Sequence, residues 1–286
     1  MSLAQALSAA LACGLERLDG QLLLLHLLGR APTDRAWLLT HDNEALNPSL
    51  LAQWNSLLQR RAAGEPMAYL TGHQEFYGLG LMVDPRVLVP RPDTETLVDW
   101  ALDLLNAPTL DLDPTDNPSP GISVIDLGTG SGAIALALKH RRPDLRITAV
   151  DASQQALGLA SLNAKRLGLE IHFQSGFWLT DVSDHYFLIV SNPPYIAEQD
   201  PHLQALRHEP ALALSSGVDG LKDIRTIIEQ APARLLPGGW LLLEHGFDQA
   251  QNVRALLAQT GFTQVQSHKD LAGIERCSGG QWREVK

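Results

Sequence analysis

Several features are scarce in this sequence of 286 residues, and each scarcity excludes a class of protein. The two cysteines, Cys13 and Cys277, lie near opposite ends and form no CxxC pair, so the sequence predicts neither a disulfide framework nor a zinc ribbon. The ten histidines form no HExxH motif and no cluster at metal-ligand spacing, so we predict no metal site. The longest near-continuous apolar stretch, Leu22 to Leu28, falls far short of the ~20 residues that cross a membrane.

Basic residues are also scarce, because 22 Lys and Arg oppose 32 Asp and Glu and give a formal net charge of −10. Lys and Arg supply most non-specific affinity for phosphate backbones, so the chain has no general attraction to nucleic acid. The N-terminus lacks the basic stretch that opens a secretion signal. We therefore expect a cytoplasmic monomer that binds neither membranes nor, directly, nucleic acid.

Two domains are expected from the length, because single hydrophobic cores stop growing at roughly 250–300 residues. Residues 1–73 place apolar side chains at helical period and predict a bundle of short helices. One of these helices should begin with Asn47 as its N-cap and Pro48 as its first residue. Nothing in this region suggests catalysis.

A β-hairpin linker is predicted at residues 74–90, where aromatic and β-branched residues from Glu75 to Val89 are interrupted by two glycines and an Asp-Pro pair. The second domain, residues 91–286, should begin with a helix that Pro92 and Asp93 start and cap.

Strands and helices alternate from residue 122 onward, which predicts a Rossmann-like α/β domain with a doubly wound, mostly parallel sheet covered on both faces. The proline-rich stretch at 106–121 predicts a solvated loop, and the segment 223–236 predicts a single helix. Such sheets bind ligands beyond the carboxyl ends of their strands, where the segments DLGTGSG, AVDAS and SNPPY lie.

The segment DLGTGSG predicts a cofactor site, because glycines permit backbone conformations closed to other residues and let a ligand approach the main chain. We call its last five residues the glycine loop: Gly128, Thr129, Gly130, Ser131 and Gly132. Asp151 follows about 20 residues later at a strand end, where its carboxylate can accept hydrogen bonds from ribose hydroxyls. NAD-binding loops place the third glycine one residue later, at the position of Ala133. The spacing G-x-G-x-G, with an acidic residue two positions before the first glycine, instead resembles that of the S-adenosylmethionine-dependent methyltransferases.

The segment SNPPY, residues 191–195, follows an apolar strand and is unusually stiff. Its prolines fix φ and bias the preceding residues toward extended backbone, so the carbonyls of Asn192 and Pro193 point in fixed directions. With the Asn192 side chain and the flat ring of Tyr195, these acceptors suit a planar NH₂ group. Holding its N–H bonds would place the nitrogen in line with a methyl group without a general base. This chemistry leaves an adenine amine and a carboxamide both open.

DLGTGSG, Asp151 and NPPY together resemble the amino-methyltransferases. Further stretches narrow the resemblance to the protein-glutamine N5-methyltransferases that act on peptide chain release factors: EPMAYLTGHQEFYGL, VLVPRPDTETLV, FQSGFW, SNPPYIAE, EPALALSSGVDGL and LLPGGWLLLEHG. The resemblance runs from about residue 65 to the end. It implies an S-adenosylmethionine-dependent methyltransferase domain, S-adenosylhomocysteine as product, and methylation of the glutamine in the Gly-Gly-Gln motif of release factors. It also implies that the helical N-terminal domain contributes to substrate recognition.

Individual roles follow from the same resemblance. The residues implied for holding the substrate glutamine are Asn192, Pro193, Pro194 and Tyr195, and the catalytic ones among them are Asn192, Pro193 and Tyr195. The glycine loop would contact the methionine moiety of the cofactor, Asp151 its ribose and Trp178 the surroundings of its adenine, and Asn192 would touch the cofactor as well. The family usually has Asp before this tryptophan, whereas Phe177 stands here, which leaves the contacts near the adenine less defined. The PRPDTE segment would line the entrance of the active site.

Three alternatives compete with this interpretation. An adenine N6-methyltransferase of DNA or RNA also needs a planar NH₂ site, but it requires a basic groove that this acidic chain does not suggest. A glutamine methyltransferase of ribosomal proteins has the same chemistry and much the same motifs. A binding protein that keeps the cofactor pocket without turnover is disfavoured by the intact Asn192.

Overall fold

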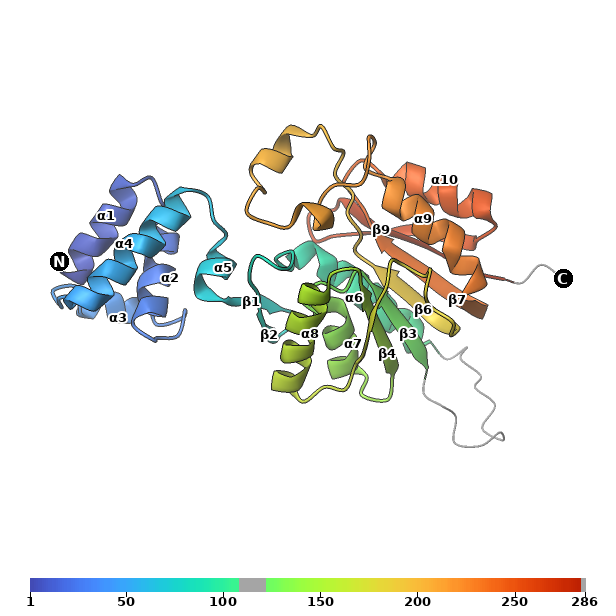
Figure 1. Cartoon of the computed structure of the whole chain (residues 1–286), viewed down its shortest axis with the longest axis horizontal. Coiled ribbons are helices and arrows are strands. Elements are labelled where there is room, and N and C mark those ends of the chain that lie inside the picture. The colour runs from blue at the N-terminus through green and yellow to red at the C-terminus, as the bar shows by residue number, and fades with distance from the viewer. Residues whose placement is uncertain (108–121, 284–286) are drawn as a thin grey trace. The chain divides into compact units, whose positions relative to one another are not determined.

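The computed structural model describes residues 1–107 and 122–283. The chain forms two compact units, Met1–His73 and Gln74–Lys286 (Figure 1). Of the loop predicted at 106–121, residues 108–121 lie outside the described part. None of the described helices combines the length and the apolar character that a membrane crossing requires.

The first unit is helical and consists of α1 (Leu3–Ala12), α2 (Arg17–Leu27), α3 (Arg35–Thr40), α4 (Pro48–Ala62) and α5 (Met67–Thr71). A capping box starts α1, in which Ser2 Oγ accepts from the Gln5 N–H at 3.2 Å and Gln5 Oε1 accepts from the Ser2 N–H at 2.9 Å. The predicted cap of α4 is confirmed, because Asn47 Oδ1 accepts a hydrogen bond from the Leu50 N–H at 2.9 Å. The apolar sides of the helices meet around the fully buried Trp54.

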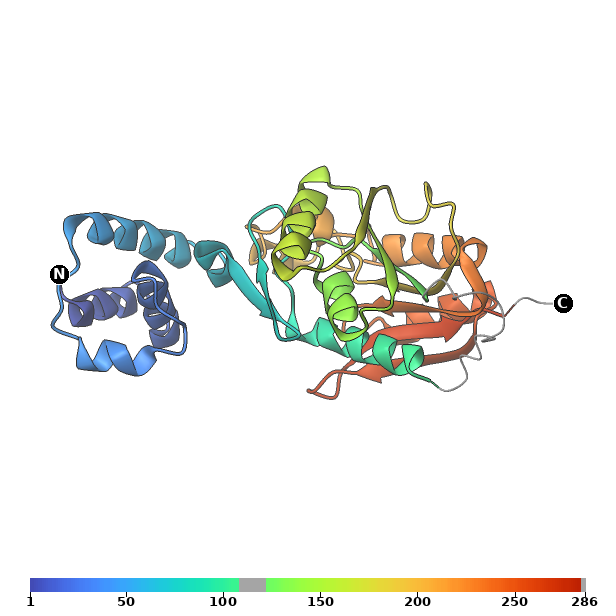
Figure 2. The ribbon, with the colours of Figure 1, turned by 90° about the horizontal axis from the view of Figure 1, so that it is seen from below.

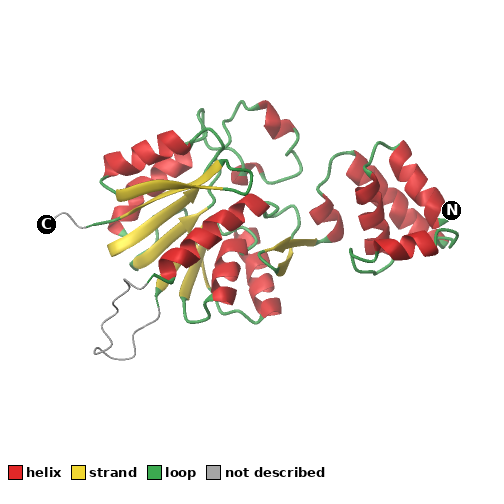
Figure 3. Cartoon of the chain, turned by 180° about the vertical axis from the view of Figure 1, so that it is seen from behind, coloured by secondary structure: helices red, strands yellow, loops and turns green. Residues whose placement is uncertain are grey.

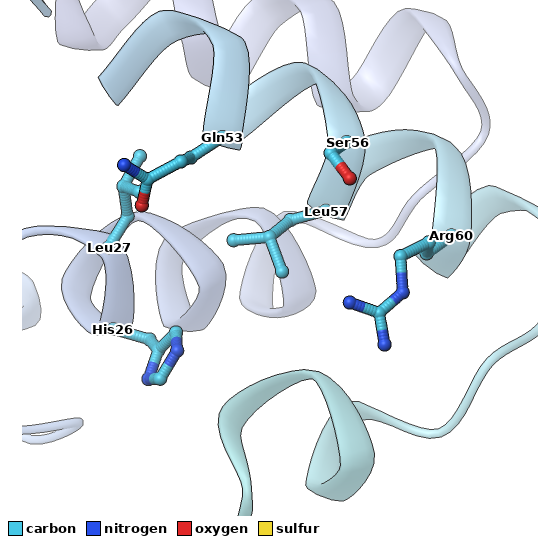
Figure 4. A pocket seen from close by; sticks show the side chains of 6 residues that line it. All are labelled: His26, Leu27, Gln53, Ser56, Leu57 and Arg60. Carbon is cyan, nitrogen blue, oxygen red and sulfur yellow. The ribbon is translucent and has the colours of Figure 1, made fainter. Parts of the chain in front are cut away.

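A hollow of about 290 Å³ lies between α2 and α4 within this unit (Figure 4). Figure 4 shows Leu57 on its wall between polar side chains. The lining residues are His26, Leu27, Gln53, Ser56, Leu57 and Arg60. Burial and the neighbouring His73 lower the pKa of His26, so its imidazole is neutral at physiological pH. None of the predicted site residues belongs to this unit.

A two-stranded sheet follows, formed by β1 (His73–Phe76) and β2 (Leu79–Met82). Tyr77 and Gly78 join the strands with φ values of 52° and 79°, and positive φ at both positions is typical of a two-residue hairpin turn. The prediction that the hairpin extends to Val89 is wrong. Asp84 Oδ1 accepts from the Arg86 N–H at 3.0 Å and from Arg86 Nε at 2.8 Å, and this local pairing folds the Asp-Pro segment into a turn.

The second unit is built on a seven-stranded sheet with the order β5-β4-β3-β6-β7-β9-β8. The pairs from β5 through β7 are parallel, whereas β9 is antiparallel to β7 and β8. The strands are β3 (Ser123–Leu127), β4 (Arg146–Asp151), β5 (His172–Ser175), β6 (Tyr186–Ser191), β7 (Leu235–Glu244), β8 (Thr263–Lys269) and β9 (Glu275–Gln281). The predicted doubly wound, mostly parallel sheet is confirmed.

Helices cover both faces of this sheet (Figure 2, Figure 3). Val124 and Leu188 point into a core shared with α6 and α7, while Ile125 and Ile189 point into a second core shared with α9 and α10. Successive strand residues thus enter opposite cores, as the two-residue period of a strand requires. The helices are α6 (Glu95–Leu105), α7 (Ala133–Arg141), α8 (Gln154–Leu167), α9 (Lys222–Gln230) and α10 (Ala250–Thr260), with 3-10 turns η1 (Pro92–Thr94), η2 (Pro201–Gln204), η3 (Ala211–Ala213) and η4 (Ala231–Ala233).

The predicted cap of α6 is wrong. The turn η1 precedes α6, and no side chain caps either element. The Asp93 carboxylate instead pairs with the Arg276 guanidinium on β9 at 3.3 Å. Asp93, which the local sequence predicts as a helix cap, therefore pairs with a charged residue of a distant strand.

The helix predicted over 223–236 is also shorter than expected. The α-helix ends at Gln230, and β7 already begins at Leu235. Pro232 lies between them and has no N–H to continue the helical hydrogen-bond ladder, which explains the early end.

Candidate active site

The parallel strands bring the marked segments of the sequence to one edge of the sheet. Leu127 at the end of β3 is in register with Ser191 at the end of β6, and Ser191 is in register with Leu243 on β7. The glycine loop, SNPPY and Glu244 therefore emerge side by side. The chain continues from β3 to β4 and β5 on one side and to β6 and β7 on the other, so β3 and β6 flank the switch point where doubly wound sheets bind ligands.

The glycine loop has a backbone that only glycine adopts readily. Gly128, Gly130 and Gly132 have φ values of 70°, 56° and 85°. A Cβ on Gly128 would lie 3.1 Å from the Trp178 ring, and one on Gly132 would lie 3.0 Å from the Leu136 side chain. The three glycines therefore adopt left-handed backbone, and the loop packs closely against Trp178 and Leu136.

Asp126 lies beneath this loop and is fully buried. Its Oδ2 accepts hydrogen bonds from Thr129 Oγ1 at 2.7 Å and from the Ala135 N–H at 3.2 Å. Its Oδ1 has no hydrogen-bond partner among the described residues. Burial raises the pKa of Asp126 to about 7, against the lowering effect of these two donors, and the neighbouring Asp151 adds to the rise.

Asp151 at the end of β4 closes the side of the loop. Its Oδ2 accepts from the Gly130 N–H at 2.9 Å, and its Oδ1 accepts from the Ser153 N–H at 2.8 Å. Burial raises its pKa, while the two backbone donors lower it. The carboxylate is thus fixed in orientation and retains acceptor capacity, since each of its oxygens can accept more than one hydrogen bond.

Trp178 is buried against the glycine loop, next to the position that a Cβ on Gly128 would occupy. Its Nε1 donates to Asp223 Oδ1 at 3.1 Å, and Asp223 Oδ2 accepts from Ser216 Oγ at 2.6 Å. The adjacent Phe177 is half exposed, with its ring centroid 5.5 Å from that of Trp178. The indole is therefore locked at the loop, while Phe177 offers an apolar face to solvent.

SNPPY is anchored at its first and its last residue. Ser191 is buried and points into the sheet, where its Oγ donates to the Leu127 carbonyl at 2.7 Å. At the other end, the Tyr195 carbonyl accepts from Gln249 Nε2 at 3.0 Å. Gly220, with φ of 73°, packs so closely there that a Cβ would collide with the Tyr195 carbonyl oxygen. The stiffness expected from the two prolines is thus reinforced by tertiary contacts.

Two side chains that sequence reasoning did not assign to the site complete it around SNPPY. Asn192 Nδ2 donates to Thr94 Oγ1 at 3.1 Å, and the Tyr195 hydroxyl donates to Glu244 Oε1 at 3.3 Å. Thr94 belongs to the PRPDTE segment, but no signal distinguished it there. For Glu244 a signal existed, because an acidic residue ends the apolar run WLLLE, but its position beside β6 depends on the strand order.

Glu244 is 1% exposed, and its Oε2 has no hydrogen-bond partner among the described residues. Burial raises its pKa to about 7, while the hydroxyls of Thr94 and Tyr195 oppose the rise. The same burial, together with the charge of Glu244, raises the pKa of Tyr195, so its phenol is protonated. In the described part of the chain, no group of three or more His, Cys, Asp and Glu side chains is arranged to hold a metal ion.

Comparison with known proteins identifies the family. Residues 2–72 match the model of the PrmC N-terminal domain, and residues 107–217 match that of the methyltransferase small domain. The release factor glutamine methyltransferase of Bordetella pertussis is 49% identical over 271 residues, which cover 93% of this chain and 95% of that protein. The chain belongs to the release factor glutamine methyltransferases. The Escherichia coli member of the family is 42% identical over 284 residues, which cover 98% of this chain and 97% of that protein.

Solved structures support the fold of this family member. A methyltransferase from Pyrococcus furiosus superposes with a TM-score of 0.52 at 17% identity, covering 73% of this chain and 90% of that one. The Thermus thermophilus 16S rRNA N2 G1207 methyltransferase, solved with AdoMet and guanosine, has a TM-score of 0.53 at 17% identity and covers 74% and 50%. At such identities the likeness concerns the fold alone, which is that of the methyltransferases.

Proposed function

We propose that the protein transfers a methyl group from S-adenosylmethionine to the side-chain N5 of the glutamine in the Gly-Gly-Gln motif of peptide chain release factors. The observation that carries this proposal is the orientation of Asn192. Its Nδ2 is taken by Thr94, and no hydrogen bond to its Oδ1 is present in the described part of the chain. An acceptor fixed in this way at the switch point is what a substrate amide requires.

The residues around the glycine loop fit S-adenosylmethionine. Three left-handed glycines keep the main chain open to a ligand, and Asp151 stands beside them with acceptor capacity for ribose hydroxyls. The buried carboxyl of Asp126 lies beneath the loop, and its Oδ1 has no hydrogen-bond partner among the described residues. Trp178 borders the loop from the side where the adenine would lie.

Side-chain and main-chain groups of SNPPY bind the glutamine amide, whose nitrogen is a poor nucleophile because its lone pair is delocalised. Asn192 Oδ1 and the Pro193 carbonyl accept its two N–H bonds, and the Tyr195 ring packs against its plane. This orients the nitrogen. Bound S-adenosylmethionine would supply an electrophilic methyl group on its sulfonium; the N–C bond would form as the C–S bond breaks with its electron pair left on sulfur, and one amide proton would pass from the nitrogen to solvent.

We assign substrate recognition in part to the helical domain, residues 1–73. Residues 74–90 form a linker that contains most of the β1–β2 hairpin, and residues 91–286 form the methyltransferase domain. The hollow between α2 and α4 offers both apolar and polar side chains for such recognition (Figure 4). Since release factors act on ribosomes, the proposed activity takes place in the cytoplasm. The enzyme would act as a monomer, without direct binding to nucleic acid or membranes.

Transfer of labelled methyl groups tests the proposal. The purified full chain is incubated with methyl-labelled S-adenosylmethionine and, separately, a release factor, its Gln→Asn variant in the Gly-Gly-Gln motif, ribosomal proteins and nucleic acid. Label should enter only the release factor that carries the glutamine. Label on nucleic acid or on the Gln→Asn variant would refute the assignment, and preferential labelling of a ribosomal protein would establish the alternative substrate.

Asn192→Ala provides the matching test within the protein. It should abolish transfer while leaving cofactor binding largely intact, because the glycine loop and Asp151 remain. Asn252→Ala on α10 is a suitable control, since Asn252 is exposed and its side chain makes no hydrogen bond among the described residues. Unchanged turnover in Asn192→Ala would remove the central residue from the mechanism.

A further inference from the structure

Two buried carboxamides connect the site to the rest of the methyltransferase domain. Asn163 on α8 is 1% exposed and donates to the glycine loop, and Gln249, which precedes α10, is 8% exposed and donates to Tyr195. The two ends of a carboxamide have nearly the same shape, but the NH₂ end donates hydrogen bonds whereas the oxygen end accepts them. The partners of each amide therefore decide which way it faces.

Asn163 has partners that fix its orientation, because all of them belong to the main chain. Its Oδ1 accepts from the Met82 N–H at 2.7 Å, and its Nδ2 donates to the Met82 carbonyl at 3.0 Å and to the Ser131 carbonyl at 2.9 Å. A main-chain N–H can only donate and a carbonyl can only accept, so an amide turned by 180° would lose all three hydrogen bonds. Asn163 therefore presents its NH₂ group to Ser131.

The peptide unit that ends the glycine loop is fixed through this contact. Its carbonyl belongs to Ser131 and is held by Asn163, while its N–H belongs to Gly132 and donates to the Thr129 carbonyl at 2.8 Å. Gly132 has a φ of 85°, and α7 begins at the next residue. Because Ser131 is buried, the peptide unit cannot turn without leaving a polar group unpaired. The loop is thus held in one conformation by the protein itself.

Gln249 holds the substrate side of the site in the same way. Its Oε1 accepts from the Gly246 N–H at 2.8 Å, and its Nε2 donates to the Tyr195 carbonyl at 3.0 Å. The Gln249 N–H in turn donates to the Gly246 carbonyl at 3.1 Å, so two hydrogen bonds join these residues. The partners of the amide are again main-chain groups, which fixes its orientation.

The peptide unit that follows Tyr195 is held at both of its polar groups as well. Its carbonyl accepts from Gln249, and its N–H, which belongs to Ile196, donates to the Leu214 carbonyl at 2.9 Å. Gly220 leaves no space beside it, because a Cβ there would collide with the Tyr195 carbonyl oxygen and would lie 2.8 Å from Gln249 Nε2. Gln249 thus restricts the main chain that carries the Tyr195 ring.

We propose that Asn163 and Gln249 are positioning residues, Asn163 for the cofactor side of the site and Gln249 for its substrate side. Each acts through one peptide unit, that of Ser131 or that of Tyr195, rather than on the reacting atoms. This inference rests on the proposed function, because it concerns how the same site holds S-adenosylmethionine and the substrate glutamine. It predicts that the two residues control different constants.

Asn163→Asp and Gln249→Glu make the same chemical change, because each replaces an NH₂ group by an oxygen and keeps the oxygen that accepts. Asn163→Asp should raise the Kd for S-adenosylmethionine in calorimetry roughly tenfold, as the loss of a buried hydrogen bond does, and leave kcat at saturating cofactor within about twofold. Gln249→Glu should leave that Kd within about twofold and lower kcat for the release factor roughly 10- to 100-fold, the size expected when a group that orients the substrate is displaced.

Asn252→Asp and Gln251→Glu on α10 are the matched controls. Both residues are exposed, and neither side chain makes a hydrogen bond among the described residues. Each control adds the same charge as its counterpart at the site and should keep the wild-type Kd and kcat. The Tm of every variant reports the stability that is lost, but a purely structural role would lower Tm without separating the two constants.

The outcomes separate this inference from the proposed function. If the wild type does not methylate a release factor, the proposed function fails, and the inference about its site fails with it. If the wild type is active, three results overturn the inference alone: an unchanged Kd in folded Asn163→Asp, an unchanged kcat in folded Gln249→Glu, or a variant that changes both constants equally.

A second set of variants covers the case in which an acidic variant does not fold. Asn163→Ala and Gln249→Ala introduce no charge and carry the same expectations and the same refuting results. Should these not fold either, amide hydrogen exchange of the ligand-free wild type decides. Slow exchange of the Gly132 and Ile196 N–H groups supports the inference, because both peptide units must be fixed before a ligand binds, and fast exchange overturns it.

Discussion

Replacing Glu244 by glutamine should change how the free energy of unfolding depends on pH. Burial raises the pKa of this carboxyl from its ordinary value of 4.5 to about 7 in the folded protein. A raised pKa means that the neutral form is favoured by folding, so its contribution to stability is fully present below about 4.5 and is lost as the pH rises through about 7. The variant has no group that titrates here and should lack this loss.

The size of the effect follows from the shift in pKa. One pKa unit corresponds to about 1.4 kcal/mol, so the full contribution is about 3 kcal/mol, and most of it, about 2–3 kcal/mol, is lost between about pH 5 and about pH 8. Because Glu244 is 1% exposed, solvent screening reduces this figure little. For a protein of this size, 1 kcal/mol shifts the Tm by roughly 2–4 °C. Relative to the wild type, the variant should gain roughly 5–10 °C over that pH interval.

The assay is thermal or denaturant unfolding of both proteins in matched buffers at several pH values. The difference between variant and wild type is the informative quantity, since packing changes that do not depend on pH cancel. A difference that stays constant from acidic to alkaline pH would refute the assignment of a raised pKa to Glu244. The control is Glu229→Gln on α9, which removes an exposed carboxylate; the difference in unfolding free energy between this variant and the wild type should change little with pH. Gln249→Glu is not suitable as a control, because Gln249 donates to the Tyr195 carbonyl.

Three further variants test the site. Asp151→Ala removes the acceptor of the Gly130 and Ser153 N–H groups and should raise the Kd for S-adenosylmethionine at least about tenfold in calorimetry; an unchanged Kd would exclude its cofactor role. Gly220→Ala places a Cβ against the Tyr195 carbonyl oxygen at a residue with positive φ, and should lower both Tm and kcat. The control Gly80→Ala has open space around its Cβ and should not affect kcat. A fully active Gly220→Ala would show that the backbone of Tyr195 need not be fixed. Trp178→Phe leaves the buried Asp223 Oδ1 without its donor and should cost about 1–3 kcal/mol in denaturant unfolding, and no loss would contradict the hydrogen bond to Asp223.

Much of the fold is written locally in the sequence. Apolar runs predicted β3, β4 and β6. The glycine spacing predicted the loop in which Gly128, Gly130 and Gly132 have left-handed φ values. The cap at Asn47 was predictable because an N-cap depends only on the next few residues. Parallel strands share an edge at their carboxyl ends, so the approximate position of Asp151 and SNPPY was predictable as well.

The features that escaped prediction depend on contacts between distant parts of the chain. Asp93 has the local sequence of a helix cap, yet its partner is Arg276 on β9. Thr94 meets Asn192 across 98 positions, and Glu244 becomes part of the site only because β7 lies beside β6. Neither periodicity nor turn chemistry carries such information, since it arises from the order of strands in the sheet.

The position of the transferred methyl group tests the central claim most directly. A release factor incubated with the protein and S-adenosylmethionine is digested, and the peptide containing the Gly-Gly-Gln motif is sequenced by tandem mass spectrometry. The account predicts one added methyl group on the side-chain nitrogen of that glutamine with the wild type, and none with Asn192→Ala. A methyl group on another residue, or an equal yield from both proteins, would contradict it.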